Sequence, residues 1–143
     1  MDKIDKQILR SLASNSRMSL KALAGRVGLA APTTSDRLKR LEERGEILRY
    51  TIDVDPQRLG YGVVAMVRIN PQPGKLRIVE RLINATSAII ECDKVTGEDC
   101  YFARVCIKSL QDVDAVLEQF HDHAQTVTCI VKSQPIRRRL PPL

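Results

Sequence analysis

The sequence predicts an α+β protein in which a helical domain comes first and a domain of strands and helices follows. Two observations support this prediction. Apolar residues recur at helical spacing over about the first 49 residues, and after residue 60 they alternate at strand spacing in segments separated by helical stretches. With 143 residues, 43% of them apolar, the chain can form two small domains. We therefore expect domains over 1–49 and 61–143, joined by a strand-forming linker over 50–60.

Three short helices are predicted for the first domain. Ser19 fits the start of the second helix, and Gly45 fits the end of the third. Only about four residues separate the second and third helices, so the two must cross steeply, as in a winged-type helix-turn-helix. The apolar positions at helical spacing are Ile4, Ile8 and Leu12, then Leu20, Leu23, Ala24 and Val27, then Leu38 and Leu41.

The third helix is the candidate DNA-binding element. If residues 31–44 are helical, Thr33, Arg37, Arg40 and Arg44 share one outer stripe. The second helix of a helix-turn-helix enters the major groove, where arginine bonds to guanine edges. A net charge of +6 also favours double-stranded DNA as the partner. The expected DNA-binding residues are Thr33, Thr34, Ser35, Arg37, Lys39, Arg40 and Arg44. The alternative is a solvated helix, whose basic residues pair with Asp36, Glu42, Glu43 and Glu46.

The second domain follows the ferredoxin-like order βαββαβ. Strands are predicted over 63–69, 88–94, 100–108 and 126–132, with helices over 76–85 and 110–121. One parity of each strand is apolar and should face the helices, including Ile90, Cys92, Val127, Cys129 and Val131. The opposite parity is mixed, and a single sheet leaves it uncovered. We expect a second copy of the chain to cover it, giving at least a dimer, whereas the alternative is a merely solvated face. This outer set comprises Val64, Met66, Arg68, Ile89, Glu91, Asp93, Phe102, Arg104, Thr128 and Ile130.

Other functional classes find little support in the sequence. No apolar run approaches the length of a membrane helix and the N-terminus does not resemble a signal peptide, so we expect a cytoplasmic protein with no membrane partner. The four cysteines form no CxxC pair and the two histidines lack ligand spacing, so no metal site is expected. A paired nucleophile and base is also missing. We therefore expect no catalytic residues, no cofactor and no enzymatic activity.

Three stretches together resemble the Lrp/AsnC, or feast/famine, family of transcriptional regulators. They are "IDKQILRSLASNSRMSLKALAGRVGLA", "RLKRLEERGEILRYTIDVDPQRLG" and "IIECDKVTGEDCYFARV", in the order and spacing of the family. The resemblance implies a helix-turn-helix joined to a ferredoxin-like effector domain, called a RAM domain. It also implies homodimers through that domain, which in the family often assemble into an octameric ring. The implied function is sequence-specific regulation modulated by an amino acid or related metabolite; the alternative is a nucleoid-type architectural protein with little sequence or effector dependence.

The turn between the two central strands is the candidate effector site. Its glycine, exposed amides and two carboxylates could hold an amino acid, although a plain hairpin turn explains the same residues equally well. The resemblance favours the effector site and implies that Thr126 and Thr128 line it from the facing chain. The family commonly shows Gly-x-x-Asp here, whereas this chain has Cys100 at the acidic position. The turn residues expected to bind the effector are Thr96, Gly97, Glu98, Asp99 and Cys100.

Two further features concern the start of the third helix and the C-terminus. The family usually places serine and proline before the third helix, whereas this chain has Ala30 and Ala31, with Pro32 displaced by one position. The usual N-cap oxygen is therefore lost unless Thr33 or Thr34 replaces it. At the C-terminus, "IRRRLPPL" is interpreted as a solvated tail, with contact to DNA as the alternative.

Overall fold

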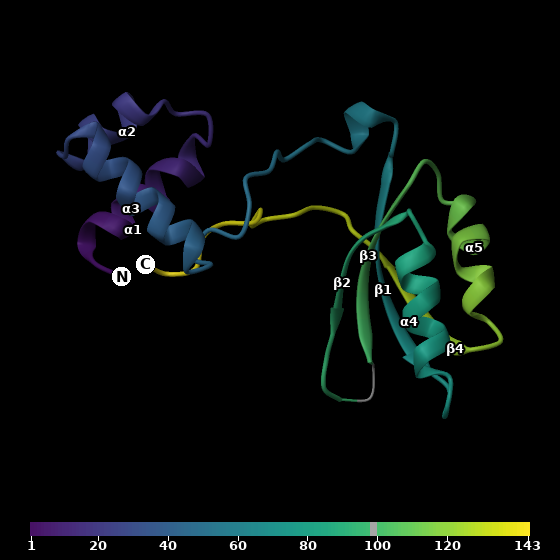
Figure 1. The fold of residues 1–143 in the computed structure, drawn as a ribbon. Coiled ribbons are helices and arrows are strands. Elements are labelled where there is room, and N and C mark those ends of the chain that lie inside the picture. The colour runs from purple at the N-terminus through teal and green to yellow at the C-terminus, as the bar shows by residue number, and fades with distance from the viewer. Residues whose placement is uncertain (98–99) are drawn as a thin grey trace. The chain divides into compact units, whose positions relative to one another are not determined.

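The computed structural model describes residues 1–97 and 100–143 (Figure 1). Contacts divide the chain into two compact units. The helical unit comprises Met1–Asp53 together with Pro135–Leu143, and the sheet unit comprises Val54–Gln134. The first boundary lies inside the predicted linker. The sequence predicts residues 135–143 as part of the second domain, but their contacts place them with the helices.

The helical unit contains three helices around a small apolar core. They are α1 (Lys3–Ser14), α2 (Leu20–Val27) and α3 (Ala31–Glu43). The predicted helices are thus all present, and each contributes a side chain to the buried core. Ile8 of α1 and Leu41 of α3 are inaccessible to solvent, and Leu23 and Val27 of α2 pack beside them.

Residues 50–56, for which alternation predicts a strand, form no strand in the single chain. They run without regular hydrogen bonding into the short 3-10 helix η1 (Gln57–Leu59). A strand needs a neighbouring strand to pair its backbone groups, and the chain places none beside this segment among its described residues. Leu48 and Ile52 are consequently about as exposed as any apolar side chain in the protein, at 86% and 80%.

The sheet unit has the predicted βαββαβ order and forms one antiparallel sheet. Its elements are β1 (Val63–Pro71), α4 (Leu76–Ala85), β2 (Ile89–Lys94), β3 (Tyr101–Ile107), α5 (Asp112–Leu117) with the 3-10 turn η2 (Glu118–Phe120), and β4 (Ala124–Ile130). The strand order is β2-β3-β1-β4, so the two edge strands are β2 and β4. This is the ferredoxin-like arrangement that the sequence predicts, and the fold class α+β is confirmed.

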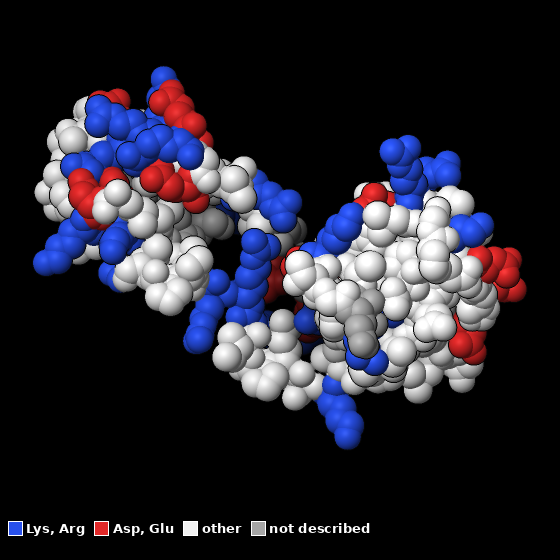
Figure 2. All heavy atoms as spheres, turned by 90° about the horizontal axis from the view of Figure 1, so that it is seen from below, with Lys and Arg blue, Asp and Glu red and all other residues white. Residues whose placement is uncertain are grey.

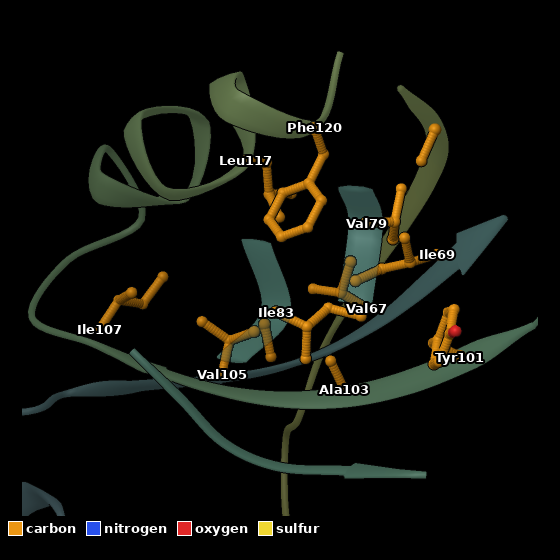
Figure 3. Close-up of a cluster of buried hydrophobic side chains, with 12 residues drawn as sticks. Val67, Ile69, Val79, Ile83, Tyr101, Ala103, Val105, Ile107, Leu117 and Phe120 are labelled. Atoms are coloured by element: carbon orange, nitrogen blue, oxygen red, sulfur yellow. The ribbon is translucent and has the colours of Figure 1, made fainter. Parts of the chain in front are cut away.

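The core of the sheet unit lies between one face of the sheet and its two helices (Figure 3). The alternating residues of β1 and β3 point to this face, as predicted. Phe120 and Val79 from the helical side are fully buried against them. The cluster comprises Ala65, Val67, Ile69, Val79, Ile83, Tyr101, Ala103, Val105, Ile107, Leu117, Phe120 and Ala124.

On the edge strands the predicted faces are wrong in part: Cys92 of β2 packs against the core as predicted, but Ile89 and Ile90 are exchanged. A register shift between Ile89 and Glu91 turns Ile90 outward, where it is 56% exposed, and brings Ile89 to the core. On β4 the whole parity is reversed. Residues directly opposite in an antiparallel pair share a face.

The pairing of β4 with β1 shows this reversal. Thr126 lies opposite Ile69 and Thr128 opposite Val67, so both threonines and Ile130, opposite Ala65, face the helices. Val127 and Cys129 lie on the outer face opposite Arg68 and Met66, and Val131 continues that face beside Val64. Periodicity alone cannot choose between two faces when valine and threonine alternate on an edge strand.

Candidate functional site

The α2–α3 pair has the geometry of a helix-turn-helix. The Ser19 hydroxyl accepts the Ala22 N–H at 3.2 Å and caps α2, as predicted. α2 ends at Gly28, whose φ of +67° lets the chain turn within three residues into α3. Among the described residues, no side chain caps the N-terminus of α3 at Ala30. The helix start instead has Pro32, whose missing N–H costs nothing in the first turn.

Within α3, Thr34 has a structural position instead of the predicted exposed one. Its side chain is fully buried, and its hydroxyl donates to the Ala30 carbonyl at 3.0 Å. A buried hydroxyl bonded within its own helix cannot reach a base edge, so the expectation of an exposed Thr34 is wrong. Thr33 and Ser35, on either side of it, are exposed and remain available to a ligand.

Arg37 also leaves the predicted outer stripe and reaches back to the first helix. Its guanidinium donates to Asp2 and, at 2.8 Å, to Asp5. The Asp5 carboxylate is only 8% exposed, so this ion pair is largely shielded from solvent on the acidic side. The pair ties α3 to the start of α1 across 32 residues of sequence, and the expected exposed position of Arg37 is wrong.

The two aspartates also form the N-terminal cap of α1. Asp2 accepts the backbone N–H groups of Ile4 and Asp5, each at 2.9 Å, while Asp5 accepts the N–H of Asp2 at 3.3 Å. The backbone N–H of Asp5 and then the Arg37 guanidinium hold the pKa of Asp2 below its usual range. Neither acid was expected from the sequence to bind Arg37. Their spacing of three residues at a helix start is the signal that could have identified them.

The remaining basic residues of α3 and its C-cap, Arg44, differ in how far acids neutralise them. Arg44 contacts Asp5 at 3.8 Å and Glu46 at 3.1 Å, and exposed Lys39 lies 3.6 Å from Glu43. Arg40 is exposed and has no ion pair among the described residues. Figure 2 shows basic and acidic side chains interleaved over one face of the helical unit. The free surface of α3 therefore centres on Thr33, Ser35, Lys39 and Arg40.

The candidate effector turn joins β2 to β3. The Val95 N–H donates to the Cys100 carbonyl at 2.8 Å and closes the pairing of the two strands. Thr96 and Gly97 are exposed, and Gly97 has a φ of +119°, which L side chains rarely adopt. The predicted ligands Glu98 and Asp99 lie outside the described residues.

A polar cluster fixes the base of this turn to α4. Glu80 accepts from the Lys94 ammonium at 2.8 Å and from the Tyr101 hydroxyl at 2.6 Å. Lys94 and Tyr101 are cross-strand partners, and the ammonium lies 5.7 Å from the centre of the Tyr101 ring. The bond from Lys94 and then that from Tyr101 lower the pKa of Glu80, so this carboxylate stays ionised at neutral pH.

The two predicted parts of the effector site do not meet within one chain. The turn extends from β2 and β3, whereas Thr126 and Thr128 lie on β4, the opposite edge of the sheet. Both threonines are partly buried on the helix side of that strand. A site formed from both parts requires a second copy of the sheet unit.

Other kinds of site find no support in the part of the chain that the structure describes. No helix among these residues is long and apolar enough to cross a membrane. In the same part of the chain, no cluster of three or more His, Cys, Asp or Glu side chains could hold a metal ion.

Comparisons with known proteins match both units of the chain. A family model for a winged helix-turn-helix DNA-binding domain matches residues 1–47, and one for the Lrp/AsnC ligand binding domain matches residues 64–141. The Bkd operon transcriptional regulator of Pseudomonas aeruginosa is 36% identical over 134 residues, which cover 91% of this chain and 83% of that protein.

Solved structures show the same arrangement of elements. LrpC of Bacillus subtilis superposes with a TM-score of 0.91 at 28% identity, covering 96% of this chain and 99% of that one. The feast or famine regulatory protein of M. tuberculosis, solved in complex with L-methionine, superposes with a TM-score of 0.87 at 27% identity, covering 98% and 97%. These matches confirm the resemblance found in the sequence.

Proposed function

This chain belongs to the Lrp/AsnC family of DNA-binding transcriptional regulators, and we propose that it binds a specific DNA sequence under the control of a small effector. The effector would be an amino acid or a related metabolite held at the β2–β3 turn between two copies of the chain. The DNA part of the proposal depends on one observation. α3 follows a tight turn and presents Arg40, which no described acid neutralises, on the same side of the helix as exposed Thr33, while Ser35 and Lys39 are exposed further round the helix.

This arrangement suits the reading of base edges. Arginine donates two parallel hydrogen bonds to guanine in the major groove, and short hydroxyl side chains bond to bases or phosphates. The inner side of α3 is fixed by Thr34, Leu41 and the Arg37 ion pairs, so the exposed residues are presented from a rigid element. The residues proposed to contact DNA are accordingly Thr33, Ser35, Lys39 and Arg40. The other predicted positions, Thr34, Arg37 and Arg44, hold the helix in place.

The experiment is a binding titration with the DNA upstream of the gene and a scrambled fragment of equal length, at fixed salt, with and without the twenty amino acids. A specific regulator prefers the native fragment by at least about 10³-fold. Equal affinity for the two fragments would contradict sequence specificity and favour an architectural protein. A change in affinity on adding the amino acids supports effector control, and dividing the pool identifies the ligand.

The effector part of the proposal is supported by the backbone at Gly97 and by a relative. Gly97 is exposed, and a Cβ there would meet no atom within 4 Å, so the space beside it is open to a ligand. The M. tuberculosis relative was solved with L-methionine, which makes that amino acid the first to test. Valine at position 97 would be strained at a φ of +119°. Gly97→Val should therefore abolish the response to the amino acids while DNA binding without them persists.

A matched control separates this effect from general strain in the sheet unit. Gly74 also has a positive φ, +79°, in an exposed turn, and a Cβ there would likewise meet no atom within 4 Å. Gly74→Val should keep the amino-acid response. If Gly97→Val responds as fully as the wild type, the effector does not bind at this turn.

We expect the outer face of the sheet to hold two copies together, and larger rings to form from such dimers. Val127 is 44% exposed on this face and Ile90 is 56% exposed, although both are large apolar residues on strands. Val127→Asp should give a smaller particle in light scattering because the charge would be buried between copies. Leu110→Asp is the control, since Leu110 is 57% exposed outside the sheet. An unchanged particle size for Val127→Asp would place the dimer interface elsewhere.

A further inference from the structure

Residues 135–143, here called the arginine tail, leave the sheet unit and join the helical unit. β4 ends at Ile130, and from Pro135 onward the contacts of the chain are those of the unit that holds α1, α2 and α3. Residues 135–142 are all exposed, as the sequence predicts for a solvated tail, yet their contacts are those of the helical unit. The tail is therefore part of the DNA-binding unit in space, although it follows the effector domain in sequence.

The tail is attached through its end and presents its charges outward. The Arg10 guanidinium of α1 donates to the main-chain oxygen of Leu143. Leu143 is partly buried, whereas Leu140 and the three consecutive arginines are exposed. Among the described residues, none of these arginines has an ion pair. They are Arg137, Arg138 and Arg139.

The tail concentrates positive charge on the helical unit. Residues 1–53 hold eleven Lys and Arg against seven Asp and Glu, a net charge of +4. The three arginines raise the unit to +7, whereas residues 54–134 hold nine basic against ten acidic residues, a net charge of −1. The unit that contains the helix-turn-helix thus has a larger net charge, +7, than the whole chain, +6, because the sheet unit is slightly negative. Such an asymmetry attracts a polyanion to one part of the molecule.

We infer that the arginine tail is a second DNA-contacting segment, which binds phosphates beside the site read by α3. This inference rests on the proposed function. Arg37 and Arg44 are neutralised by acids of their own unit, so the unpaired tail arginines replace charge that α3 itself cannot offer. Consecutive arginines on an extended segment suit a row of phosphates, which fixes position and adds affinity without reading sequence.

The test compares salt dependence among full-length variants. Replacing Arg137, Arg138 and Arg139 together by alanine should weaken binding to native and scrambled DNA by the same factor. The slope of log affinity against log salt should fall by about 0.9 for each phosphate that the variant no longer neutralises. Replacement of the same three residues by lysine should restore most of the slope, because lysine keeps the charge.

A control with the same loss of charge uses the exposed arginines of the sheet unit. Replacing Arg58, Arg77 and Arg81 by alanine changes the net charge equally but leaves the helical unit intact. This variant should keep the wild-type slope. If the tail and control variants shift the slope equally, the effect is one of total charge, and the inference is overturned.

Two other outcomes separate this inference from the proposed function. A tail variant with the wild-type slope and affinity shows that the arginines do not touch DNA, while the function of α3 stands. A tail variant that loses preference for the native fragment would assign the tail to base reading and overturn its role in binding phosphates. Absence of wild-type binding to any DNA would reject the function and the tail together.

Discussion

The two units of this chain are held together by different physics. In the sheet unit, Phe120, Val79 and their neighbours form one apolar layer between the sheet and its helices. The helical unit has only four buried apolar residues in its core cluster among the described residues, and it adds a largely buried aspartate that holds Arg37. Small domains bury a smaller fraction of their surface on folding, so apolar packing leaves them only marginally stable. Here charged groups complete the structure of the unit that must meet a charged partner.

This difference explains why basic residues on α3 have unequal roles. Arg37 and Arg40 are three residues apart, yet the first is tied to Asp2 and Asp5 while the second has no ion pair among the described residues. The ion pair costs the protein a cation that could have met DNA. In return it fixes the orientation of the helix that carries Arg40.

The largest difference between the two units is expected when the apolar core of the sheet unit is disrupted. Phe120→Ala should lower the free energy of unfolding of that unit by about 3 to 5 kcal/mol, because a fully buried aromatic ring leaves a cavity. Hydrogen exchange should accelerate in the sheet and spare α1 and α3. Leu110→Ala, at an exposed position, should change little. Equal acceleration in both units would show that they unfold as one.

A smaller effect is expected from the ion pair in the helical unit. Asp5→Asn keeps the shape of the side chain but leaves Arg37 with Asp2 alone, which should cost about 1 to 3 kcal/mol of unfolding free energy. Hydrogen exchange should now accelerate in α1 and α3. Asp36→Asn, on the exposed side of α3, should stay within about 0.5 kcal/mol of the wild type. If Asp5→Asn is as stable as the wild type, the apolar residues of α3, and not the ion pair, hold this helix in place.

Removing each arginine of α3 should separate stability from recognition. Arg40→Ala should weaken binding to the native DNA by about 1 to 3 kcal/mol and relax the base preference at one position, with an unchanged melting temperature. Arg37→Ala should lower the melting temperature of the helical unit, because Asp5 would remain partly buried without its closest cation. If Arg37→Ala alone changes base preference, that residue releases its aspartates and reads DNA itself.

The smallest effect concerns Glu80 in the sheet unit and depends on pH. Because Lys94 and Tyr101 lower the pKa of Glu80, its ion pair stabilises the folded state above the usual pKa of glutamate. That contribution is lost as the pH falls through the lowered pKa. From about pH 6 to about pH 3, Glu80→Gln should therefore lose less unfolding free energy than the wild type. Identical pH profiles would show that the cluster contributes no net stability.

All four strands were predictable, but the faces were predictable in full only for the two core strands. β1 and β3 are flanked on both sides, so their inward residues must be apolar and the alternation identifies the face. β2 contains a register shift at Ile89, and β4 alternates valine with threonine, which both fit a strand. Local pattern does not contain the pairing register. The faces of Ile90, Thr126 and Val127 therefore follow only from the pairing with the neighbouring strands, which the tertiary structure provides.

The sequence by itself determined the order of elements, the turn between α2 and α3, and the family to which the chain belongs, because these follow from local spacing and from motifs. Only the tertiary structure decided which charges are free. Asp5 and Arg37 are 32 residues apart, and Arg10 and Leu143 are 133 apart. Whether two distant charged groups meet depends on how the helices pack. The packing of the chain therefore makes Arg37 a structural residue of the helical unit and places the arginine tail with that unit.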